Sequence, residues 1–104
     1  GSDLIDAKKA RKMIKDKKID YVIDVRTTTE WKLGHYPGAE HIPTDRITKK
    51  KLEKLSADYK DKVFLVYCNT GQRARVAAEK LRSFGVKDTY YIPGTYLSIL
   101  PHDE

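Results

Sequence analysis

The chain has 104 residues and carries 21 Lys and Arg against 15 Asp and Glu, a formal net charge of +6. This length fits one domain, expected over residues 3–104 after a Gly1-Ser2 remnant of tag removal, and excludes two full domains. Because Cys68 is the single cysteine, an intramolecular disulfide and a multi-cysteine zinc site are both excluded.

The N-terminal segment predicts a helix followed by a strand. Over residues 3–18, apolar side chains recur at three- and four-residue intervals between lysines, which predicts an amphipathic helix with Ser2 or Asp3 as its N-cap. Residues 20–25 are short, β-branched and almost continuously apolar. That pattern is typical of a strand buried on both faces of a sheet.

Two further helices are predicted before the next strand. A short helix at 27–33 precedes a segment rich in proline and glycine, 36–43, which predicts a turn and a short extended stretch. Either Thr44 or Asp45 is expected to cap the lysine-rich helix that then runs through Leu55.

The second half of the chain alternates strand, helix and strand. Residues 63–67 and 89–92 predict strands, and a helix from 74 to 84 is expected to turn Val76 toward the core. The order of elements predicts an α/β fold, a mostly parallel sheet of four or five short strands with helices on both faces. Such sheets place their sites in the loops after the strands, and Cys68 occupies that position.

The segment from Cys68 to Arg73 links the end of a predicted strand to a predicted helix. Backbone N–H groups in a curved loop, together with the positive end of the helix dipole, form an anion-binding cradle, and Gly71 permits the curvature. Nearby cations such as Arg73 and Arg75 favour a thiolate, so Cys68 is predicted to be a nucleophile. The alternative is a buried, inert cysteine.

The chain resembles the single-domain rhodaneses through several motifs that keep their order. These motifs are Asp24-Val25-Arg26, Glu30-Trp31, Gly34-His35-Tyr36-Pro37-Gly38-Ala39, Ile42-Pro43 and Val66-Tyr67-Cys68-Asn69-Thr70-Gly71-Gln72-Arg73-Ala74. The short form looks closest to the small stress-associated rhodaneses of bacteria, some of which are exported to the periplasm. The compartment of this chain stays open between cytoplasm and periplasm, because a native leader could have been removed with the tag.

The resemblance implies a rhodanese-like three-layer fold and a thiosulfate sulfurtransferase activity. Cys68 would take the outer sulfur of a donor such as thiosulfate as a persulfide and pass it to cyanide, a thiol or a protein acceptor. The loop residues that would bind the persulfide and the donor are Asn69, Thr70, Gly71, Gln72 and Arg73. Asp24, Arg26 and Arg75 are possible supporting residues. No cofactor or metal is expected beyond the covalent persulfide.

Two alternative functions stay open. The chain could be a persulfide carrier or interaction module that relays sulfur between proteins and turns over poorly with thiosulfate. A phosphatase or arsenate reductase is a more distant alternative, because phosphatase loops look like Cys-x5-Arg whereas the loop here is Cys-x4-Arg, from Cys68 to Arg73, one residue shorter.

Other polar residues are interpreted as structural. Asp24 and Arg26 are expected to form a salt bridge that holds loops together, with Glu30 as a further partner of Arg26. His35 and His41 match no common metal-ligand spacing, so a structural or surface role is favoured.

The predicted first and middle helices are rich in lysine. Lysines of the first and middle helices alternate with acidic residues, so a solvated surface is favoured over a nucleic-acid partner. No membrane partner is expected, since the longest apolar run, 63–67, is far shorter than the roughly 20 residues of a membrane span.

The C-terminal tail departs from the rhodanese pattern. Of the usual Gly-Gly-x-x-x-Trp pattern after the last strand, only Gly94 is kept, and Tyr96 and Leu97 are expected to flank the mouth of the site.

Overall fold

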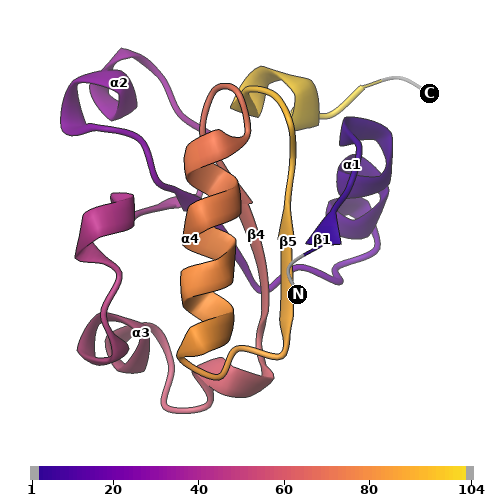
Figure 1. The fold of residues 1–104 in the computed structure, drawn as a ribbon. Helices are drawn as coiled ribbons and strands as arrows, with labels where there is room; N and C mark the ends of the chain where they lie inside the picture. The colour runs from indigo at the N-terminus through magenta and orange to yellow at the C-terminus, as the bar shows by residue number, and fades with distance from the viewer. Residues whose placement is uncertain (1–2, 103–104) are drawn as a thin grey trace.

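A computed structural model describes residues 3–102, which form a five-stranded sheet with helices on both faces (Figure 1). All four strand pairs are parallel, and the strand order across the sheet is β1-β5-β4-β2-β3. The strands are β1 (Asp3–Leu4), β2 (Tyr21–Asp24), β3 (Glu40–His41), β4 (Val63–Tyr67) and β5 (Asp88–Tyr91). The predicted α/β class, with four or five parallel strands, is confirmed.

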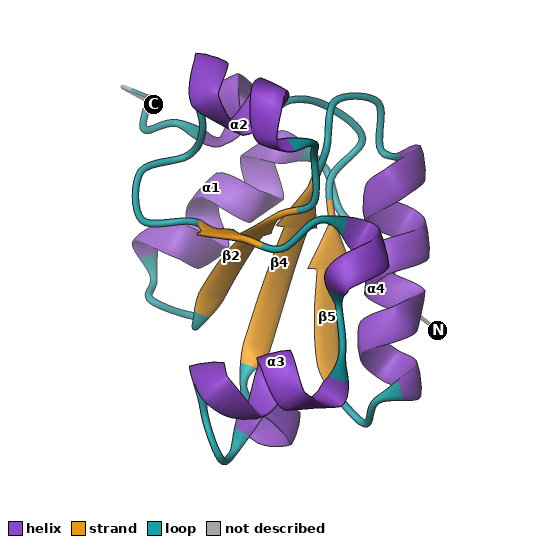
Figure 2. Ribbon diagram, turned by 90° about the vertical axis from the view of Figure 1, so that its left-hand side faces the viewer, coloured by secondary structure: helices purple, strands orange, loops and turns teal. Residues whose placement is uncertain are grey.

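Within residues 3–102, four α-helices flank this sheet. They are α1 (Ala7–Lys15), α2 (Thr28–Leu33), α3 (Lys49–Leu55) and α4 (Gln72–Ser83). Figure 2 shows α1 on one side of the sheet and α4 on the other, with α2 above the ends of the strand arrows. The carboxyl ends of β2 and β4 therefore meet α2 and the start of α4 at one edge of the sheet.

Alternation along β4 divides the core into two layers. Phe64 and Val66 point into the layer beneath α3 and α4, and Cys68, two residues further on, lies in the same layer. Leu65 and Tyr67 point the opposite way, into the layer beneath α1. This two-residue period follows from strand geometry, and it places the sulfur on the α4 side of the sheet.

The predicted first helix is wrong at its start. Residues Asp3–Leu4 form the edge strand β1, which pairs with β5 through Asp3 to Tyr90 and Leu4 to Tyr91. The helix begins at Ala7, and its N-cap is Asp6, whose carboxylate accepts the backbone N–H of Lys9 at 2.7 Å. Asp3 is therefore not the cap, and the alternative cap, Ser2, lies outside the described residues.

Two other boundaries and the orientation of one side chain differ from the prediction. Thr48, rather than Thr44 or Asp45, caps α3, because residues 44–46 form a separate 3-10 helix. Helix α4 begins at Gln72 instead of residue 74. Val76 faces outward with 47% of its surface exposed, because α4 buries Ala74, Ala77, Ala78 and Leu81 instead.

Among residues 3–102, no helix has the length and apolar character needed to cross a bilayer.

Candidate functional site

Cys68 lies inside the loop between β4 and α4. Its side chain is buried, and its Sγ accepts the backbone N–H of Gly71 at 3.1 Å and of Ala74 at 3.4 Å. Gly71 is the N-cap of α4 and has no side chain to cap the helix. The sulfur therefore accepts the Ala74 N–H, which the oxygen of a capping side chain would otherwise accept. The sulfur therefore occupies a position at which the helix dipole and two N–H groups stabilise negative charge.

Gly71 is required here for two reasons. Its φ of 91° lies in the left-handed region, which a side chain disfavours. A Cβ at this position would also lie 3.1 Å from the Cα of Pro93 and 3.3 Å from the carbonyl oxygen of Ile92. The loop thus curves tightly around the sulfur while its back touches the segment that follows β5.

We expect Gly71→Ala to destabilise the domain and to displace the loop from Cys68. Gly38→Ala is the matched control, because Gly38 has a similar φ of 84° but no atom within 4 Å of an added Cβ. Gly38→Ala should cost about 1 kcal/mol for the left-handed backbone alone. Gly71→Ala should cost about 1 to 3 kcal/mol more, from the close approach to Pro93. Urea denaturation of both variants measures the difference, and equal losses would contradict the packing argument.

A single carboxylate, that of Glu30 on α2, joins α2 to the loop. Its Oε1 accepts Nη1 of Arg73 at 2.7 Å, and its Oε2 accepts Nη2 of Arg73 at 3.0 Å and Nδ2 of Asn69 at 2.7 Å. Glu30 also completes the capping box of α2 with Thr27. The hydrogen bond from Arg73, then that from the Thr27 backbone, holds the pKa of Glu30 far below its usual value, so the carboxylate stays ionised at neutral pH.

The predicted pairing of Glu30 with Arg26 is wrong. Arg26 instead pairs with Asp24, as predicted, through Nε and Nη2, the shorter contact being 2.7 Å. Arg26 also donates from Nη2 to the carbonyl of Gly34 at 2.6 Å, which fixes the end of α2. Arg26 is thus committed to Asp24 and the backbone, and it leaves Glu30 to the loop.

Tyr67 completes a buried network around Asp24. Its hydroxyl donates to Asp24 Oδ2 and accepts the backbone N–H of Tyr36. Burial, and then the hydrogen bond to Asp24, raises the pKa of Tyr67 well above its usual value. The Arg26 guanidinium lies over the rings of Tyr67 and Tyr96, at 5.5 Å and 5.4 Å from their centroids. Tyr96 therefore lies against this network, whereas its neighbour Leu97 is exposed.

His35 and His41 both stack on Trp31. The ring centroids of Trp31 and His35 lie 3.4 Å apart, and those of Trp31 and His41 lie 4.8 Å apart. Nδ1 of His35 bonds to the Trp31 carbonyl, and Nε2 of His41 bonds to the Arg26 carbonyl. The structural role favoured for both is consistent with these contacts. In residues 3–102, His, Cys, Asp and Glu side chains form no cluster suited to a metal ion.

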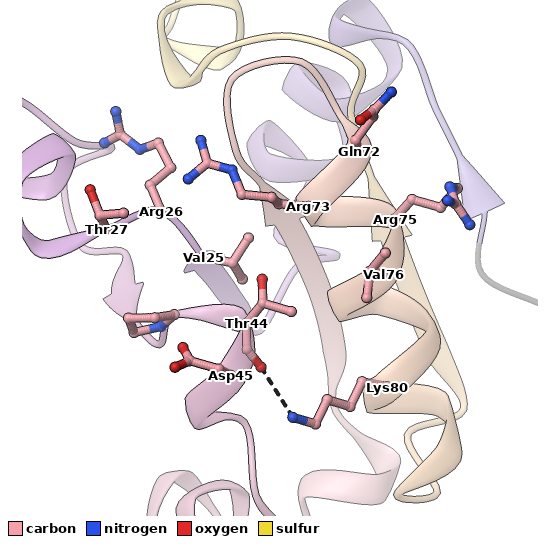
Figure 3. A pocket seen from close by; sticks show the side chains of 11 residues that line it. Val25, Arg26, Thr27, Thr44, Asp45, Gln72, Arg73, Arg75, Val76 and Lys80 are labelled. Carbon is pink, nitrogen blue, oxygen red and sulfur yellow. Dashed lines mark hydrogen bonds between the residues drawn. The ribbon is translucent and has the colours of Figure 1, made fainter.

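A cavity of about 580 Å³ lies beside the loop, between α4 and the segments that follow β2 and β3 (Figure 3). Its cationic lining consists of Arg26, Arg73, Arg75 and Lys80. Arg73 extends from α4 toward Arg26 on the opposite wall, as Figure 3 shows. Arg75 points away from the loop and pairs with Glu79, 3.0 Å apart, on the exposed side of α4.

The remaining predicted loop residues differ in exposure. Asn69 is half-buried and bound to Glu30, while Thr70 and Gln72 are exposed to solvent. Sequence reasoning missed the backbone N–H of Ala74 as a partner of the sulfur and Glu30 as a partner of the loop. Because Gly71 has no side chain, no capping oxygen accepts the first N–H groups of the helix, which include that of Ala74. This was the signal in the sequence that the Ala74 N–H needs another acceptor, such as the sulfur.

Comparison with known proteins assigns the family. The sequence profile of the rhodanese-like domain matches residues 6–100, nearly the whole chain. The chain belongs to the rhodanese-like domain family. The α/β fold and its parallel sheet are therefore those of a rhodanese-like domain, as the motifs predicted.

Curated relatives of this rhodanese-like domain include larger proteins. The tRNA uridine(34) hydroxylase of Cronobacter sakazakii is 34% identical over 74 residues, covering 69% of this chain and 21% of that protein. The protein YqhL of Bacillus subtilis is 33% identical over 75 residues, covering 72% of this chain and 56% of that protein. The chain thus spans about a fifth of the hydroxylase and about half of YqhL.

Solved structures support the same fold. The human single domain sulfurtransferase TSTD1 has a TM-score of 0.76 at 20% identity, and the match covers 100% of both chains. The BH2092 protein of Bacillus halodurans has a TM-score of 0.72 at 30% identity, covering 89% of this chain and 68% of that one.

Proposed function

We propose that this rhodanese-like domain is a sulfurtransferase that carries sulfur as a persulfide on Cys68. The observation that carries the proposal is the position of the Cys68 sulfur, which accepts the N–H groups of Gly71 and Ala74 at the start of α4. Those donors stabilise an anionic sulfur on the nucleophile and on the outer atom of a persulfide. No cofactor is needed, because the protein's own sulfur holds the transferred atom.

The proposed reaction has two displacements. In the first, the Cys68 thiolate attacks the outer sulfur of thiosulfate, a sulfur–sulfur bond forms, the bond within thiosulfate breaks, and sulfite leaves with its electron pair. In the second, cyanide or a thiolate attacks the outer sulfur of the persulfide and regenerates the Cys68 thiolate. This sequence predicts ping-pong kinetics. Because the chain has one cysteine, the persulfide cannot resolve to an internal disulfide and waits for an external acceptor.

Intact-mass measurement after incubation with thiosulfate tests the proposal. We expect the chain to gain the mass of one sulfur atom and to lose it when cyanide is added. A chain that stays unmodified by thiosulfate at every concentration tested would overturn the thiosulfate reaction.

A persulfide carrier is the second candidate, because the N–H groups of Gly71 and Ala74 would hold a persulfide on Cys68 whichever donor supplied it. Rates with thiosulfate and cyanide, set beside rates with a persulfidated protein donor and a protein thiol acceptor, separate the two candidates. The carrier predicts faster exchange with proteins. Phosphatase and arsenate reductase activities are disfavoured, because the loop is one residue shorter than Cys-x5-Arg.

The larger relatives are named for hydroxylation of a tRNA uridine. We propose neither that reaction nor that substrate for this chain, because the chain matches only about a fifth of the hydroxylase. The partners we propose are a small anionic sulfur donor and a thiophilic acceptor, without nucleic acid or membrane.

A further inference from the structure

Every arginine around the candidate site is paired with a carboxylate. Arg73 pairs with Glu30 at 2.7 Å, Arg26 with Asp24 at 2.7 Å and Arg75 with Glu79 at 3.0 Å. These three arginines, together with Lys80 and Asp45, supply the charged side chains that line the cavity beside the loop. The charge of each of the three arginines is thus balanced by a carboxylate, although the chain as a whole carries a net charge of +6.

The pair of Arg73 and Glu30 is the one that bears on the sulfur. Arg73 lies in the first turn of α4, next to the loop that surrounds Cys68, and both terminal nitrogens of its guanidinium bond to the Glu30 carboxylate. A bidentate pair of this kind is among the stronger hydrogen-bonded contacts that arginine makes. A dianionic donor that approaches Cys68 therefore meets a guanidinium whose charge is already balanced, and the Glu30 carboxylate repels it.

We propose that Glu30 is a specificity-determining residue that, by holding Arg73, makes the site favour sulfur donors of low negative charge over dianions such as thiosulfate. This inference rests on the proposed sulfur transfer to Cys68 and narrows its donor class. Donors that fit are persulfides of neutral or singly charged carriers and thiosulfonates, which offer an outer sulfur with less charge than thiosulfate.

Methanethiosulfonate and thiosulfate are suitable probes, because both carry one outer sulfur on a tetrahedral sulfur centre but differ by one charge. With methanethiosulfonate, the Cys68 thiolate forms a bond to the outer sulfur, the original sulfur–sulfur bond breaks, and methanesulfinate leaves with its electron pair. With thiosulfate the same bonds form and break and sulfite leaves. The ratio of kcat/KM for the two donors therefore reports the electrostatics of the site.

Glu30→Gln is the test variant. Glutamine serves at the same position of a capping box, so α2 keeps its N-terminal cap while the carboxylate charge is removed. We expect the kcat/KM of thiosulfate relative to methanethiosulfonate to rise roughly fivefold at low ionic strength, mainly through a lower KM for thiosulfate. The rise should shrink toward nothing as added salt screens the freed guanidinium.

Glu79→Gln is the matched control. It removes the carboxylate of the pair between Arg75 and Glu79, which lies on the exposed side of α4 with both side chains more than half exposed. The donor ratio should stay at its wild-type value, because solvent already screens that pair. An equal rise in both variants would trace the effect to net charge and overturn the role of Glu30.

A purely structural role for Glu30 gives a different result. Loss of loop geometry would lower the kcat/KM of both donors by the same factor. If the ratio of thiosulfate to methanethiosulfonate is unchanged or lower in Glu30→Gln, the inference is overturned, whereas the proposed sulfur loading of Cys68 is not. If neither donor loads the wild-type chain with sulfur, the proposed function itself fails, and the inference fails with it. The two failures are thus distinguished by intact mass of the wild-type protein.

Discussion

Replacing Cys68 with serine should abolish sulfur loading while leaving the domain folded. The thiolate is the nucleophile of the proposed reaction, and a serine hydroxyl is a far weaker one at neutral pH. We expect sulfite release from thiosulfate to fall by at least about a thousandfold, as when other covalent nucleophiles are removed. Intact mass after thiosulfate treatment should show no added sulfur.

The fold should survive this substitution because the serine oxygen can accept the same two N–H groups. Gly71 and Ala74 donate to the sulfur in a fully buried position, so a group must remain there to receive them. Cys68→Ala is the contrasting variant, because alanine leaves both donors without that acceptor and should cost about 1 to 3 kcal/mol more than serine. Urea denaturation measures this difference. A Cys68→Ser protein that forms a persulfide at the wild-type rate would refute the assignment of the nucleophile.

Local patterns predicted the main elements of the fold because the relevant forces are local. Strand β4 is an apolar, β-branched and aromatic run, and the position of Cys68 after it follows from the alternation of strands and helices. The order of these elements was enough to predict a parallel sheet, since helical crossovers connect parallel strands. The loop after β4 could therefore be placed at the carboxyl edge from sequence.

Contacts between distant segments could not be predicted in the same way. The two residues of β1 continue the helical spacing of α1 and become a strand only because β5, far along the chain, offers an unpaired edge. Thr44, Asp45 and Thr48 all have side chains that cap helices, so local chemistry did not choose among them.

The partner of Glu30 shows the same limit at the site. The sequence predicts Arg26, four residues before Glu30 in the chain, as the partner of that carboxylate. In the structure Arg26 pairs with Asp24, two residues away. Glu30 pairs instead with Arg73, which lies in the first turn of α4. Which charged side chains pair in a folded domain depends on which of their neighbours already have a partner, and only the tertiary structure shows this.

The Asp24 network should be the most sensitive polar element of the fold. Asp24 is fully buried and accepts the backbone N–H and the guanidinium of Arg26 and the hydroxyl of Tyr67. Asp24→Asn keeps the shape of the side chain but leaves the Arg26 charge buried without a counter-charge. Breaking a buried ion pair in this way typically costs about 3 to 5 kcal/mol, which is a large part of the stability of a small domain.

Asp16→Asn is the matched control for this loss, because it removes the carboxylate of the exposed pair with Lys12. That change should cost less than about 1 kcal/mol. The double variant Asp24→Asn, Arg26→Met completes a double-mutant cycle, and it should recover part of the stability because no unpaired charge remains. Recovery would show that the single variant is destabilised by the orphaned guanidinium. If Asp24→Asn costs no more than Asp16→Asn, Arg26 reaches solvent without the carboxylate, and the network does not hold the end of α2 against the loop.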